Sequence, residues 1–101
     1  MIIKATDSTF KTLISEHSKA LIKFGATWCG PCKLADKILE QVSADHPEAI
    51  IITVDVEECP QAATALGISN VPHNILSVNG NVEWAASGVQ TKTKYLELLA
   101  S

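Results

Sequence analysis

The sequence predicts an α/β fold, a three-layer α/β/α sandwich with a mixed central sheet. Over the first two thirds of the chain, apolar β-branched segments alternate with segments whose apolar residues recur at helical spacing, which is typical of βαβ units with parallel strands. The last third instead places an Asn-Gly pair between two strand-like segments, which predicts an antiparallel hairpin.

The first predicted strand and helix are short. Residues 1–5 form an apolar run, and Asp7 stands where it can cap the helix that follows. In that helix Phe10, Leu13 and Ile14 recur at helical spacing. The chain therefore begins with a strand and then a helix.

The next strand and helix carry the central part of the fold. Residues 20–26 are apolar at successive positions except for Lys23, as expected of a strand that helices cover on both faces. A long helix is predicted from near Cys29 to about Asp45, because apolar residues recur there every three or four positions. Pro31 suits its first turn, where no backbone N–H is needed.

The remaining segments complete the order β-α-β-α-β-α-β-β-α, in a single domain that spans residues 1–101. The last two strands flank a turn centred on Asn79-Gly80. The predicted strands are residues 49–56, 73–78 and 82–87, and the predicted helices are residues 59–67 and 91–100.

Charge, apolar content and cysteine count together exclude several classes of partner and location for this protein. The formal charge is −3 and basic residues do not cluster, so we expect no nucleic-acid partner. The N-terminal segment is too poor in apolar residues for a signal peptide and no later segment is long enough to span a membrane, so we expect a cytoplasmic protein without membrane association. Three cysteines are an odd number at modest density, which favours a reducing compartment and a catalytic or metal-binding role for a close pair.

The close pair is Cys29 and Cys32, which stand between the predicted central strand and the long helix. In open α/β sheets the functional crevice lies beyond the carboxyl ends of the strands. At a helix start, Cys29 faces free backbone N–H groups and the positive end of the helix dipole, which favour the thiolate. We expect Cys29 to attack a substrate disulfide and Cys32 to release the reduced product. Gly30 allows close approach, and Pro31 stiffens the loop.

These features together resemble the thioredoxin family. The resemblance covers essentially the whole chain, and it is carried by WCGPCK from Trp28 to Lys33, a later Val71-Pro72 dipeptide, VDVEECP before the third helix, and the Asn-Gly hairpin. It implies a thioredoxin fold and reduction of disulfides in protein substrates. It also implies a thioredoxin reductase, either a flavoprotein or ferredoxin-linked, that restores the dithiol. We expect a monomer with no cofactor and no metal.

The resemblance also implies the surroundings of the cysteine pair. Trp28 is expected to flank the site. Val71-Pro72 is expected to be a cis peptide bond that packs against the cysteines, with the backbone at Pro72 accepting an extended substrate segment.

Lys23 departs from the family pattern, since family members usually carry a buried acid at this position. We therefore expect the acid to be missing. Three arrangements of the lysine are open: it is deprotonated by burial, it pairs with a nearby thiolate, or it extends its ammonium outward to water. An ammonium near Cys32 would make the couple less reducing, so Lys23 is a candidate for tuning the redox potential.

Further departures lie in the strand after Pro72. His73 replaces a common threonine, and it either stabilises the Cys29 thiolate and shuttles protons or is a solvated residue at the rim. Asn74 and Ser77 are polar where the family is apolar. We therefore expect this strand to be incompletely covered or to contact a particular partner.

Other functions also fit parts of the sequence. The cysteine pair could be half of a zinc site that Cys59 or His73 completes, although no second CxxC is present. A more oxidising disulfide exchanger or isomerase, or a docking subunit of a larger protein, would retain the same fold. Cys59 itself is interpreted as a small, dispensable residue at a helix start, with a regulatory or intermolecular thiol as the alternative.

Overall fold

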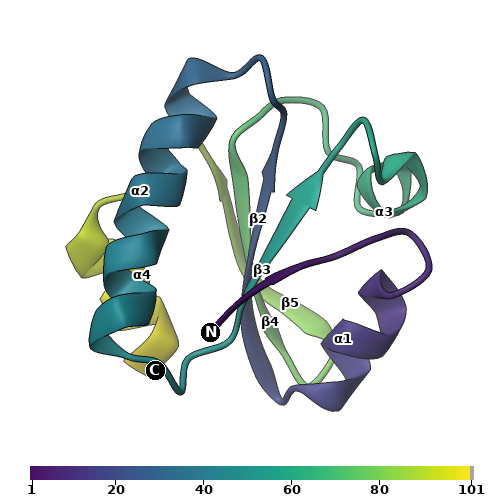
Figure 1. Cartoon of the computed structure of the whole chain (residues 1–101). Helices are drawn as coiled ribbons and strands as arrows, with labels where there is room; N and C mark the ends of the chain where they lie inside the picture. The colour runs from purple at the N-terminus through teal and green to yellow at the C-terminus, as the bar shows by residue number, and fades with distance from the viewer. Residues whose placement is uncertain (101) are drawn as a thin grey trace.

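A computed structural model of the chain describes residues 1–100 and contains a sheet between two pairs of helices (Figure 1). The order of elements along the chain is the predicted one, and the α/β class is confirmed. The strands are β1 (Ile2–Lys4), β2 (Lys19–Gly25), β3 (Ile51–Asp55), β4 (His73–Val78) and β5 (Asn81–Ser87). The helices are α1 (Phe10–Glu16), α2 (Gly30–Asp45), α3 (Pro60–Ala65) and α4 (Lys92–Ala100).

The five strands form one mixed sheet in the order β1-β3-β2-β4-β5. β3 is parallel to both β1 and β2, whereas β4 is antiparallel to β2 and to β5. The hairpin between β4 and β5 turns at Asn79 and Gly80, whose φ angles are 53° and 81°. Both values are positive, as the two-residue turns of tight hairpins require.

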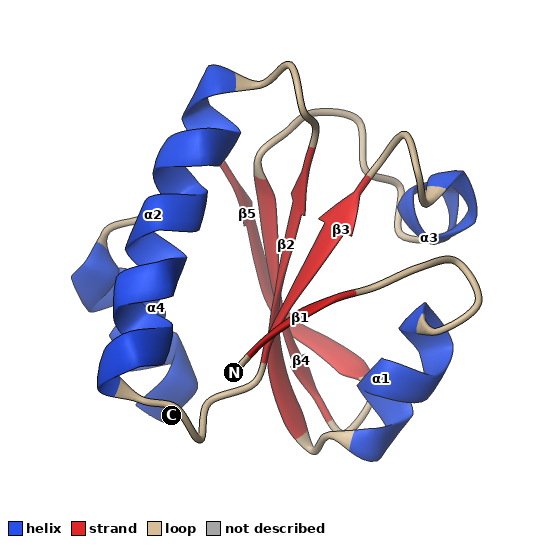
Figure 2. Cartoon of the chain, viewed as in Figure 1, coloured by secondary structure: helices blue, strands red, loops and turns tan. Residues whose placement is uncertain are grey.

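The sheet separates two cores, with α2 and α4 on one face and α1 and α3 on the other (Figure 2). Alternate residues of β2 point to opposite faces. Ile22 and Phe24 pack in the core of α1 and α3, whereas Leu21 packs in the core of α2 and α4. Lys23 and Gly25 follow Leu21 at alternate positions, so both face α2.

The predicted role of Asp7 is wrong. The N-cap of α1 is Thr9, and no side chain caps that helix. The carboxylate of Asp7 instead accepts hydrogen bonds from the backbone N–H groups of Gln61 (3.3 Å) and Ala62 (3.1 Å). Asp7 therefore caps α3, because the fold brings the loop after β1 against the start of a helix far along the chain.

The expectation that the strand after Pro72 is incompletely covered is also wrong. Asn74 is 0% exposed and Ser77 is 3% exposed, because β4 lies inside the sheet with helices over both faces. Asn74 donates to the backbone oxygens of Ala86 (3.1 Å) and Gly88 (2.7 Å) and accepts from the Tyr95 hydroxyl (2.8 Å). The amide is thus satisfied within the protein. The Ser77 hydroxyl finds no hydrogen-bond partner among residues 1–100.

Candidate active site

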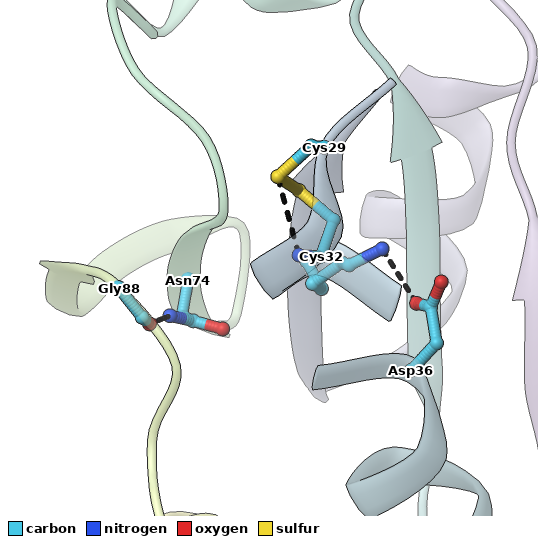
Figure 3. The surroundings of a disulfide bond; sticks show 6 residues. Cys29, Cys32, Asp36, Asn74 and Gly88 are labelled. Atoms are coloured by element: carbon cyan, nitrogen blue, oxygen red, sulfur yellow. Dashed lines mark hydrogen bonds and ion pairs between the residues drawn. A yellow bond between two sulfur atoms is a disulfide. The ribbon is translucent and has the colours of Figure 1, made fainter. Parts of the chain in front are cut away.

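Cys29 and Cys32 form a disulfide at the junction of β2 and α2, with their Cα atoms 5.3 Å apart (Figure 3). Cys29 is the N-cap of α2, and its sulfur accepts a hydrogen bond from the backbone N–H of Cys32 at 3.2 Å. Cys29 is 5% exposed and Cys32 is 1% exposed. The predicted helix start is therefore confirmed, and the more exposed cysteine of the two is the one at the helix N-terminus.

Small apolar residues pack against the disulfide, and an exposed tryptophan precedes it in the chain. Ala26 packs with the two cysteines, and Val71 packs against this small cluster. The Val71-Pro72 peptide bond is cis, as the resemblance implies. Trp28, beside the disulfide in sequence, is 70% exposed. Exposed residues therefore adjoin two sulfurs that are themselves nearly buried.

His73 begins β4, directly after Pro72, and its ring is tied to β5. Its Nδ1 lies 3.2 Å from the Ser87 hydroxyl, which donates to the side-chain oxygen of Asn70 at 2.9 Å. A serine hydroxyl has one proton to donate. Because Asn70 receives that proton, Nδ1 of His73 donates to Ser87, and Nε2 is the ring nitrogen left for other partners.

Of the three arrangements expected for Lys23, extension of the ammonium outward to water is wrong, and the other two stay predictions because the two cysteines form a disulfide here. Lys23 is 5% exposed, and its Nζ forms an ion pair with Oδ1 of Asp36 at 2.5 Å. The strand carries no acid at this position, as expected, but Asp36 of α2 supplies a carboxylate beside it. Sequence reasoning overlooked Asp36. A usable signal existed, since Asp36 follows Cys32 by four residues and so shares its side of the helix.

A cavity of about 450 Å³ lies on the α2 side of the sheet, and Lys23, Gly25 and Asp36 are among its lining residues. A Cβ atom on Gly25 would lie 2.8 Å from Nζ of Lys23 and 3.3 Å from Sγ of Cys32. The missing side chain therefore leaves the space that the lysine ammonium uses to approach the active-site sulfur.

Cys59 is far from this chemistry. It packs in the core of α1 and α3, and its thiol donates to the backbone oxygen of Ala5 at 3.5 Å. Burial raises the pKa of the Cys59 thiol. A zinc site completed by Cys59 would require this thiol to lie beside Cys29 and Cys32. Cys59 instead packs in a different core, so it cannot complete such a site. Within residues 1–100 no group of three or more His, Cys, Asp or Glu side chains is arranged to hold a metal ion.

The sequence predicts no segment long enough to span a membrane, and the helices of the structure bear on that prediction. Across the described part of the chain, none of them combines the length and the apolar character that crossing a bilayer needs.

The fold and the cysteine pair define a redox-active CxxC protein, with a dithiol-disulfide site at the end of a central strand. The thioredoxin family model matches residues 1–101. A thioredoxin from Staphylococcus aureus (strain Mu50) is 35% identical over 99 residues, which are 97% of this chain and 94% of the relative. The chain belongs to the thioredoxin family.

Solved structures agree with this assignment. A mutant thioredoxin from Halobacterium salinarum superposes with a TM-score of 0.87 at 25% identity, covering 97% of this chain and 87% of the other. Mitochondrial thioredoxin 3 from Saccharomyces cerevisiae, in its oxidized form, gives 0.85 at 29% identity, covering 98% and 93%. The protein is a thiol-disulfide oxidoreductase that acts on disulfide-containing proteins and depends on a reductase.

Proposed function

We propose that Cys29 is the nucleophile and Cys32 the resolving cysteine of a protein-disulfide reductase. The Cys29 thiolate attacks a substrate disulfide, forms a mixed disulfide and expels one substrate thiolate. The Cys32 thiolate then attacks the Cys29 sulfur, restores the intramolecular disulfide and expels the second substrate thiolate. The substrate gains the two electrons that the dithiol loses, and the expelled thiolates take up the two protons that the cysteines release.

The asymmetry between the two sulfurs supports this assignment of roles. Cys29 is the N-cap of α2 and accepts the N–H of Cys32 at 3.2 Å. Free N–H groups and the helix dipole stabilise negative charge at that position. Cys32 lies inside the first turn and is 1% exposed, so a protein substrate reaches Cys29 first.

The residues around the pair form the proposed substrate surface. Trp28 and Pro31 are exposed and offer apolar contact, while Gly30 has no side chain to hold a substrate backbone away. Val71 packs against the disulfide, and we assign the backbone at the cis Val71-Pro72 bond to an extended substrate segment. Lys23 and His73 are proposed to tune the redox potential.

We propose that the protein acts as a cytoplasmic monomer of one domain, residues 1–101, and that a thioredoxin reductase recharges it. The chemistry belongs to two sulfurs, so the proposal needs no cofactor. An odd number of cysteines, one of them buried and unpaired, supports a reducing compartment.

The roles of the cysteines are tested by the reduction of insulin disulfides with dithiothreitol as electron donor. Cys29→Ser and Cys32→Ser should each abolish catalysis, whereas Cys59→Ser, the matched control, should retain it. Cys32→Ser should accumulate a mixed disulfide with the substrate and Cys29→Ser should not. Catalysis that persists in Cys29→Ser would overturn the assignment, and a cellular role that persists when both are serine would favour the docking subunit.

The direction of electron flow is tested separately. Equilibration of the Cys29–Cys32 pair against glutathione should give a potential more negative than that of glutathione. A more positive potential would favour the oxidising exchanger or isomerase.

A further inference from the structure

Lys23 is a buried charge on the helix-covered face of the central strand. A buried ammonium is costly unless it is paired, and here the partner is Asp36, whose side chain is 44% exposed. Pairs of this kind contribute little net stability compared with apolar residues of similar size. Stability alone therefore does not account for a charge buried at this position.

Cys32 lies beside the ion pair of Lys23 and Asp36. Asp36 follows Cys32 by one helical turn on the same face of α2. Nζ of Lys23 and Sγ of Cys32 lie 2.8 Å and 3.3 Å from one common point, the Cβ position that Gly25 leaves empty, so they are at most 6.1 Å apart. Charges at such distances change the ionisation of a neighbouring group. Figure 3 shows the ion pair of Asp36 next to Cys32.

We propose that Lys23 and Asp36 act as one unit that sets the thiolate fraction of Cys32. This inference rests on the proposed role of Cys32 as the resolving cysteine. The Lys23 ammonium stabilises the Cys32 thiolate, and Asp36 holds the ammonium in place while offsetting part of its charge. Both are positioning residues. They supply on the α2 side of the sheet an electrostatic environment that neither residue provides alone.

The unit acts in the resolving step. The Cys32 thiol releases its proton to solvent through the adjoining cavity, and the Cys32 thiolate attacks the Cys29 sulfur. The bond between Cys29 and the substrate sulfur breaks, and the substrate leaves as a thiolate with the electron pair and takes up a proton from solvent. The cysteines are oxidised and the substrate is reduced, with no further reactant.

Other charged groups also face this region. Each is more exposed than Lys23, so solvent screens its effect on Cys32 more strongly. They are Lys33 and Glu40 of α2, Lys4 of β1 and Asp55 at the end of β3, whereas His73 pairs with Phe24 in the sheet and so points to the opposite face. Glu40 lines the same cavity one turn beyond Asp36, which makes it a matched control.

The test measures alkylation of Cys32 by iodoacetamide against pH in a Cys29→Ser background, with mass spectrometry separating Cys32 from the buried Cys59. Lys23→Met should raise the midpoint by about one pH unit, roughly tenfold less thiolate at neutral pH. Asp36→Asn should lower the midpoint by a smaller amount, and Glu40→Gln should leave it unchanged. Damage to packing would move the first two variants in the same direction, so opposite shifts identify the charge effect.

A kinetic readout uses the intact cysteine pair and 5,5′-dithiobis(2-nitrobenzoic acid), which releases one coloured thiolate for each attack by a protein sulfur. Lys23→Met should slow the second release about tenfold and leave the first unchanged. Asp36 is half exposed, so Asp36→Asn is expected to fold even if Lys23→Met does not. The alkylation midpoint of Cys32 in Asp36→Asn then still tests the inference.

The inference would be overturned by equal alkylation midpoints in all variants, or by shifts of the same sign for Lys23→Met and Asp36→Asn. If the wild type still reduces insulin in that case, the proposed function stands without the inference. Failure of the wild type to reduce insulin would instead overturn the proposed function, whatever the Cys32 midpoints are.

Discussion

Two polar residues, Lys23 of β2 and Asn74 of β4, are buried side by side in the sheet. They are directly opposite each other in the antiparallel register, so both side chains point to the face that α2 and α4 cover. Their surroundings differ. Asn74 is held by three neutral hydrogen bonds in the α4 half of that face, whereas Lys23 forms an ion pair with Asp36 and lines a cavity beside Cys32.

The difference separates polar burial that supports the fold from polar burial that supports chemistry. A buried network whose donors and acceptors are all paired has no free hydrogen-bonding group for a substrate. Such a network instead favours one arrangement of the core. A single ion pair beside a cavity and a reactive sulfur can respond to a change of charge on that sulfur. We therefore expect changes at Asn74 to reduce stability with little effect on catalysis, and changes at Lys23 to do the reverse.

The largest effect on stability is expected from Asn74→Ala. It removes an amide that pairs with the Tyr95 hydroxyl and two backbone oxygens, and it leaves the buried hydroxyl and the two part-buried oxygens without that partner. The free energy of unfolding should fall by about 3 kcal/mol in urea titrations. Asn81→Ala, at an exposed position of the same hairpin, is the control, and a loss no greater than that of the control would contradict a supporting role for Asn74.

Tyr95→Phe should have the next largest effect, about 1 kcal/mol at neutral pH, because Asn74 loses one partner. Burial, and to a smaller extent the Asp36 carboxylate, raises the pKa of the Tyr95 hydroxyl above its ordinary value of 10.0. The unfolded chain therefore releases this proton first, and the stability contribution of Tyr95 is complete below pH 10 and is lost as the pH rises further. The difference between wild type and Tyr95→Phe should narrow above pH 10 in urea titrations. A difference that stays constant would mean that the hydroxyl does not resist ionisation.

Lys23→Met is expected to change the free energy of unfolding by less than about 1 kcal/mol. Methionine keeps most of the apolar stem, and the Asp36 carboxylate is exposed enough to be hydrated after its partner is removed. Urea titration beside Asn74→Ala makes the comparison direct. If both substitutions cost the same, the distinction between the two buried residues fails.

Gly25→Ala should have the smallest effect on stability, about 0.5 kcal/mol or less. The new methyl group would lie 2.8 Å from Nζ at the flexible end of Lys23 and 3.3 Å from Sγ of Cys32, so the ammonium must move from its position. The Cys32 alkylation midpoint should nevertheless rise, in the direction of Lys23→Met, because the ammonium is moved. In a Lys23→Met background the same glycine change should add no further shift, and an additional shift there would show that the glycine acts on Cys32 directly.

The order of strands and helices, the Asn-Gly turn and the position of Cys29 at a helix start could all be predicted from the sequence. Each depends on residues close together in the chain, through apolar periodicity, the φ angles a turn demands, and the free N–H groups at a helix N-terminus. The WCGPCK segment also identified the family and, through it, the cis bond before Pro72.

Only the tertiary structure decided which partners the polar residues found. Asp7 caps α3 and not the helix beside it in sequence, Asn74 is covered by α4, and Lys23 meets Asp36 across the space left by Gly25. A hydrogen bond or ion pair acts over a few ångströms, so its partner depends on which distant segments the packed fold brings together. Apart from the helical spacing that places Asp36 on the same side as Cys32, local patterns carry no information about that choice until the layers of the sandwich are in place.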